Sequence, residues 1–97
     1  MLTWPPKDPD EVLDYQINWA GTPEVPGPLF ASADIIATST WIVPVGITKD
    51  SDSDTDTTTT IWLSGGTLGA TYEFLNRITT TGGRTMDQSV RLRIRGK

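Results

Sequence analysis

Residues 71–94, TYEFLNRITTTGGRTMDQSVRLRI, decide the fold because their side chains alternate in character along the chain. In the first half, from Thr71 to Thr80, one predicted face carries Tyr72, Phe74, Asn76 and Ile78. In the second half, from Met86 to Ile94, it carries Gln88, Val90, Leu92 and Ile94. A period of two is typical of a strand with one buried face, and Gly82-Gly83 suits the tight turn of a hairpin. The stretch therefore predicts two antiparallel strands that share one core.

The rest of the chain repeats strand signals, whereas no window keeps apolar residues at helical spacing over three turns. Further strands are expected at residues 12–19, 34–43, 45–48 and 57–63. The proline-rich residues 21–28 and the polar residues 49–56 are expected to form loops. Short strands separated by turns predict an all-β protein, an immunoglobulin/fibronectin-III-like antiparallel β-sandwich of about seven strands. We expect an extended N-terminal arm at residues 1–10 and a single sandwich domain at residues 11–97.

Cysteine and histidine are both absent from the 97 residues. Their absence excludes disulfide bonds, thiolate nucleophiles, Cys/His zinc sites and the commonest general base. No apolar run is long enough to span a bilayer, and the N-terminus lacks the charged-then-apolar pattern of a signal peptide. We therefore expect a soluble protein that is made in a cytoplasm and has no membrane partner.

The charged residues are distributed unevenly along the chain. Residues 1–56 carry ten acids and two bases, a net charge of −8, whereas residues 57–97 carry two acids and six bases, a net charge of +4. The opposite charges either pair inside one fold or bring together facing surfaces of neighbouring subunits. The total of −4 argues against nucleic acid as a partner, because phosphate binding needs a basic surface.

Aspartates recur at alternate positions in the polar stretch, as Asp50, Asp52, Asp54 and Asp56. Carboxylates on a flexible loop are calcium ligands, but this run lacks the glycine and the final glutamate of an EF-hand loop. Acidic runs are usually solvated. Calcium binding at residues 50–56 therefore stays an alternative, and we assign no metal site.

Paired carboxylates such as Asp8/Asp10 and Asp10/Asp14 are further candidates for chemistry. Acid-base hydrolysis needs two carboxyl groups held across a substrate by several converging elements. These residues instead lie beside prolines in an extended segment, and we interpret them as a polar approach to the first strand. We predict no catalytic residue, no cofactor and no enzymatic activity.

The four tryptophans fall into two sets. Trp19, Trp41 and Trp62 lie within expected strands, where large aromatic side chains usually pack in the core. Trp4 precedes the first strand, and Pro5 and Pro6 stiffen the backbone after it. We interpret this segment as a docking peg for a neighbouring subunit. The alternative is that it folds back over its own sandwich.

Three arginines are expected on one outward face of the C-terminal hairpin. Arg91 and Arg93 are two residues apart on one strand, and Arg77 lies on its partner. Such a row either promotes solubility or docks the acidic face of an adjacent copy.

Several motifs resemble known families. Residues 63–72, LSGGTLGATY, look like the turn that leads into the penultimate strand of immunoglobulin-like domains, with Tyr72 as the corner tyrosine whose hydroxyl bonds upstream backbone. More closely, residues 7–15 (KDPDEVLDY), 36–41 (IATSTW) and 76–85 (NRITTTGGRT) resemble small structural proteins of tailed bacteriophages, of the fibre-tail adaptor or neck type.

The resemblance implies a non-enzymatic virion protein that links the neck or tail of a tailed phage to fibres or neighbouring tail proteins. Its partners would be other phage structural proteins, it would be present in multiple copies, and it would be assembled in the host bacterial cytoplasm. The alternatives are a capsid head-decoration protein and a carbohydrate- or adhesion-binding module of the same fold.

Overall fold

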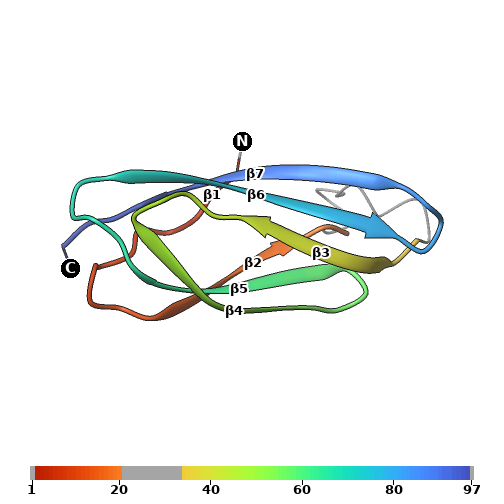
Figure 1. Cartoon of the computed structure of the whole chain (residues 1–97), viewed down its shortest axis with the longest axis horizontal. Helices are drawn as coiled ribbons and strands as arrows, with labels where there is room; N and C mark the ends of the chain where they lie inside the picture. Colours follow the sequence, from red (N-terminus) through yellow and green to blue (C-terminus); the bar gives the residue numbers. More distant parts are fainter. Residues whose placement is uncertain (1, 21–33, 97) are drawn as a thin grey trace.

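A computed structural model of the chain describes residues 2–20 and 34–96 (Figure 1). These residues form seven strands and no helix: β1 (Leu2–Thr3), β2 (Leu13–Asn18), β3 (Ile36–Ile42), β4 (Ile47–Asp54), β5 (Thr58–Gly65), β6 (Thr71–Thr80) and β7 (Thr85–Arg93). The prediction of an all-β protein with about seven strands is confirmed. Accordingly, the described ranges contain no helix that is long and apolar enough to cross a membrane.

The strands form two sheets that pack as a sandwich (Figure 1). One sheet has the order β1-β7-β6-β3 and the other β2-β5-β4. All neighbours are antiparallel except β1 and β7, which are parallel. In immunoglobulin terms, β2, β5 and β4 take the places of strands B, E and D, and β3, β6 and β7 those of C, F and G. The predicted sandwich is therefore confirmed.

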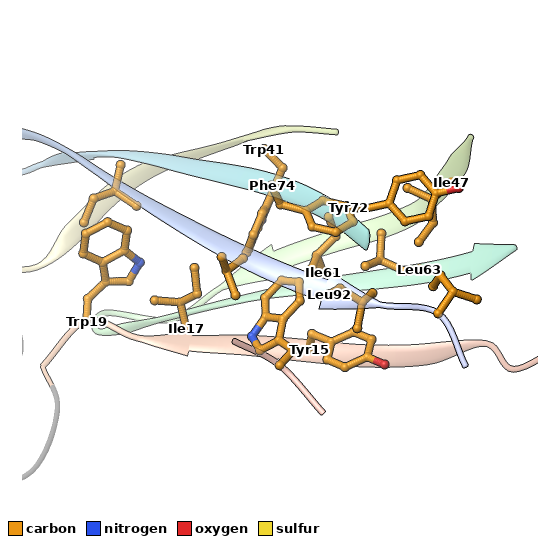
Figure 2. Close-up of a cluster of buried hydrophobic side chains, with 14 of the residues drawn as sticks. Tyr15, Ile17, Trp19, Trp41, Ile47, Ile61, Leu63, Tyr72, Phe74 and Leu92 are labelled. Carbon is orange, nitrogen blue, oxygen red and sulfur yellow. The ribbon is translucent and has the colours of Figure 1, made fainter. Parts of the chain in front are cut away.

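The inner faces of the two sheets enclose a core rich in aromatic side chains (Figure 2). Phe74, Val90 and Leu92 from one sheet and Ile61 and Leu63 from the other have no exposed surface. The alternation predicted for the C-terminal hairpin is present, because the even-numbered residues of β6 are all buried. The bounds of β6 match the prediction, and β7 begins one residue before the predicted strand.

Residues 49–56 differ from the expectation of a solvated loop. Strand β4 continues to Asp54 and pairs with β5 along its length, although every side chain after Ile47 is exposed. An edge strand takes its hydrogen bonds from one neighbour and needs no buried face, so no apolar alternation marks it in the sequence. The short strand expected at 45–48 is the beginning of β4. The loop expected at 21–28 lies outside the described residues.

The N-terminal segment lies along β7 and is part of the sandwich. The N–H groups of Trp4 and Lys7 donate to carbonyl oxygens of β7 at 2.9 and 3.0 Å. Pro5 and Pro6 stand between these two donors, and because they have no N–H they leave no donor unpaired. The buried ammonium of Lys7 donates to the carbonyl oxygen of Gly65 at 2.7 Å. Residues 2–8 are thus extended, but they do not project as the expected arm, because β7 offers them a parallel ladder.

Tyr72 ties two turns together, as predicted for a corner tyrosine. Its hydroxyl oxygen accepts from the N–H of Thr67 at 3.0 Å, and its O–H donates to the carbonyl oxygen of Gly46 at 3.4 Å. Gly46 has a φ of 106°, and a Cβ there would lie 2.9 Å from the hydroxyl oxygen. Glycine is therefore required where the β3–β4 turn meets the ring.

We expect Tyr72→Phe to lower the free energy of unfolding by about 1 to 2 kcal/mol, because it leaves the Thr67 N–H without its acceptor. The matched control is Tyr15→Phe, since the buried Tyr15 hydroxyl has no hydrogen-bond partner among the described residues. That variant should be as stable as the wild type or more stable. Urea denaturation of both variants checks the prediction, and equal stability of Tyr72→Phe and wild type would contradict it.

Candidate partner-binding surface

Arg77, Arg91 and Arg93 lie on the outer face of the four-stranded sheet and are exposed. Arg77 makes a bidentate pair with Asp87, at 2.8 and 2.9 Å, which raises the pKa of Arg77 and lowers that of Asp87. Arg91 lies opposite Glu73 on β6. Two acids therefore stand among the three arginines, which leaves this face a net charge of +1. The spacing predicted the shared face but not the acids beside it.

Trp4 lies inside the sandwich, with 7% of its surface exposed. Its ring stacks on Tyr15 with 4.8 Å between centroids, and its Nε1 donates to the carbonyl of Gln16 at 3.1 Å. Pro5 is exposed and Pro6 is half-buried. The docking-peg interpretation required the Trp4 ring to be outside the sandwich, so its premise is wrong, and the alternative of folding back describes the segment.

Trp62 was expected in the core, but it is 40% exposed. It lies on the outer face of the three-stranded sheet, opposite Asp14 on β2 and Ser51 on β4. The sequence held a signal for this, since Ile61 and Leu63 enter the core and a period of two sends the residue between them outward. Exposed tryptophans carry much of the binding energy at protein interfaces. Trp62 is therefore a candidate contact residue that the sequence reasoning missed.

The aspartates expected to be calcium candidates lie along the edge strand β4 and in the turn after it. Asp52 accepts from the ammonium of Lys49 at 2.7 Å, and Asp50 accepts from the hydroxyl of Ser64 at 3.0 Å. Asp50 is the extra residue of a bulge between Lys49 and Ser51. In the described ranges, no group of three or more acidic side chains is arranged to hold a metal ion.

The carboxylates near the N-terminus hold a turn. Asp8 accepts from the N–H of Asp10 at 2.9 Å, while Glu11 accepts from the N–H of Asp8 at 2.8 Å. Asp14 points outward from β2, opposite Trp62. The three aspartates therefore do not converge on one site, and two of the carboxylates in this region serve local structure.

The ion pair between Asp34 and Arg84 joins the acidic and basic halves of the chain. Asp34 accepts from the guanidinium of Arg84 at 2.9 Å, from the N–H of Gly82 at 3.0 Å and from the hydroxyl of Thr81 at 2.9 Å. These bonds fasten the β6–β7 turn to the start of β3. A hydrogen bond from Thr80 contributes most to holding the pKa of Asp34 well below its ordinary value, and the three groups above add to it against the effect of burial.

The lowered pKa of Asp34 predicts a loss of stability in acid. Because the pKa is lower in the folded than in the unfolded state, where it is near 3.9, unfolding takes up a proton. The contribution is complete above about pH 5 and is lost as the pH falls through about 4 toward the lowered pKa. We expect the Asp34→Asn variant to melt about 5 to 10 °C lower at pH 7 and to lose less stability than wild type between pH 5 and pH 3. Thermal melts across this range check it, and identical pH dependence in the two proteins would refute it.

Comparison with known families gives the surface a context. A family model described as podophage GP4 fiber-tail adaptor protein gp77 matches residues 7–93. The chain belongs to this family. No curated protein matches it.

The fibre-tail adaptor family match extends from the buried Lys7 to Arg93 at the end of β7. It includes the corner Tyr72 and all three arginines, and it leaves out Trp4, Pro5 and Pro6. The resemblance to phage structural proteins is thereby confirmed. A fibre-tail adaptor is a structural component of the phage particle that binds other phage structural proteins, and membership gives this chain that role.

Proposed function

We propose that the chain links the neck or tail of a tailed phage to its fibres or to neighbouring tail proteins, in several copies and without catalysing a reaction. The observation that carries the proposal is the family match over residues 7–93, which includes every strand except β1. The protein is assembled into the particle in the cytoplasm of the host.

The charge distribution supports contacts between copies or with neighbouring tail proteins. The exposed Arg91 and Arg93 lie on one sheet, while the aspartates of β4 lie at the edge of the other. Of the ion pairs described, Lys49–Asp52 and Arg77–Asp87 each join residues from the same half of the chain. Among the described residues, Asp54 of β4 has no ion pair and is exposed, so it is available to a base of a neighbour. Each exposed pair contributes under about 1 kcal/mol, so these charges orient subunits more than they bind them.

Localisation on purified virions tests this function. Electron microscopy of particles that carry a tagged copy should place the tag at the junction of tail and fibres. Particles that lack the protein should lose their fibres and retain filled heads. A tag distributed over the capsid would instead favour the head-decoration alternative.

A charge-matched pair of variants tests the arginine face. We expect Arg91→Gln with Arg93→Gln to reduce incorporation into particles at low ionic strength, and we expect the difference from wild type to shrink at high ionic strength, where salt screens the wild-type arginines. The control is Gln16→Glu with Asn18→Asp, which also changes the net charge by −2 but on the exposed face of β2. Incorporation is measured by immunoblotting of purified particles, and an equal reduction in both variants would show that net charge alone matters.

A further inference from the structure

Among residues 2–20 and 34–96, three of the four sheet edges are protected and the edge of β3 is not. β1 is two residues long and is followed by two prolines. At β2, the indole of Trp4 bonds the carbonyl of Gln16. β4 carries charged side chains along its length. Short strands, prolines and charges are the devices by which natural proteins block edge pairing.

Strand β3 has none of these devices. Its sequence, IATSTWI, contains no charged residue, no proline and no glycine. Sheet order ends at β3 within the described residues, and the backbone hydrogen bonds described for residues 37–42 run to β6. At its start, the N–H of Ile36 donates to the carbonyl of Asp56 at 2.9 Å, which places the β4–β5 turn beside β3. The outer edge of β3 over residues 37–42 can therefore pair with an extended chain from a partner.

The opposite sheet shows what such a chain would face. Lys49, Asp52 and Asp54 of β4 lie opposite Leu63, Ile61 and Thr59 of β5, which are all fully buried. These three β4 side chains therefore point to the inner face of their sheet, yet they are exposed. The four-stranded sheet covers β5 and stops short of β4. A strand added beside β3 would lie over β4 and cover these charges.

We propose that β3 is the docking edge for an extended segment of a neighbouring virion protein in which lysine or arginine occurs at every second position. Alternate side chains of that segment would point toward β4, where Asp52 and Asp54 are also two residues apart. The sheets of a sandwich are about 10 Å apart, a gap that long basic side chains span. Asp52 already pairs with Lys49 at 2.7 Å, whereas Asp54 has no ion pair among the described residues. Neither β3 itself nor residues 21–33 contain a basic residue, and the chain's own alternating arginines, at 91, 93 and 95, lie in a segment that is already paired with β6 and with residues 2–7. Charge complementarity therefore favours a different protein over a second copy or this chain's own segment.

This inference rests on the proposed function, because it names the chemistry of the partner. The probe is a peptide of about nine residues in which lysine alternates with threonine, measured by calorimetry and by amide chemical shifts at 0.15 M salt. It should bind the protein and shift the amides of residues 37–42. A peptide of the same composition with its lysines in one block, and one with alternate N-methyl groups that block the ladder, should bind at least about tenfold more weakly.

Two double variants locate the charges that matter. Asp52→Asn with Asp54→Asn should weaken binding of the alternating peptide about tenfold. Ser51→Lys with Ser53→Lys adds the same net charge of +2 on the outer face of the same strand and should change binding less than about twofold. Equal weakening by both variants, equal binding of the block peptide, or no binding at all would overturn the inference. Peptide binding tests this edge and virion localisation tests the function, so each can fail while the other stands.

Discussion

Replacing Trp4 by alanine is expected to lower the free energy of unfolding by about 3 to 5 kcal/mol, a large part of the stability of a domain this size. Trp4 is only 7% exposed, and its ring contacts three other aromatic rings: Tyr15, Trp41 and Phe74. It also bonds the edge of β2 while its own backbone pairs with β7, so it connects the two sheets. Its removal opens a cavity that neighbouring strands cannot close.

The matched control is Trp62→Ala, which removes the same side chain from an exposed position. We expect a loss of about 1 kcal/mol there. Urea denaturation followed by far-ultraviolet circular dichroism measures both variants without relying on tryptophan fluorescence. Similar losses for the two would show that residues 2–8 do not take part in the cooperative fold.

The sequence predicted the C-terminal hairpin well because both of its strands have one buried face. In β6 the inward positions Tyr72, Phe74 and Ile78 are apolar, whereas the outward positions Glu73 and Arg77 are charged. The same reasoning failed for β4, whose exposed faces are polar on both sides. Alternation of apolar and polar residues reflects which side chains are buried. A strand whose side chains are nearly all exposed, such as β4, therefore shows no alternation in its sequence.

Trp4 was expected outside the sandwich and Trp62 inside it, and the structure shows the reverse for a physical reason. Composition marks both residues as large and apolar, but location relative to the core depends on strand pairing. The outward position of Trp62 could be predicted from its neighbours Ile61 and Leu63. The burial of Trp4 instead depends on parallel pairing with β7, 88 positions away in the register Leu2–Val90 and Thr3–Arg91. No local pattern contains that pairing.

The candidate surface shows the same limit. The spacing placed Arg77, Arg91 and Arg93 on one face, because alternation and the hairpin turn suffice for that. The counter-charges Glu73 and Asp87 became visible only with the register of β6 against β7. The bare edge of β3 likewise depends on sheet order, which the sequence does not state.

A buried polar network gives the second large expected effect. Asn76 has no exposed surface, yet its amide fills all four of its hydrogen-bonding positions. Its Oδ1 accepts from Trp19 Nε1 at 3.1 Å and from the Thr59 hydroxyl at 2.7 Å. Its Nδ2 donates to the Ser39 hydroxyl at 2.9 Å and to the Thr40 carbonyl at 3.1 Å. One side chain thus joins β3, β5, β6 and the residue after β2.

We expect Asn76→Ala to lower the free energy of unfolding by about 3 kcal/mol, because it leaves several buried donors and acceptors unpaired. Thr59→Val should cost less, since the Trp19 indole keeps its bond to Asn76. If the network acts as a unit, the double variant should lose less than the sum of the two single losses, with a coupling of about 1 kcal/mol or more. Urea denaturation of the wild type, both single variants and the double variant measures this coupling. Strictly additive losses would mean that Asn76 only fills space, and that apolar packing alone holds the two sheets in register.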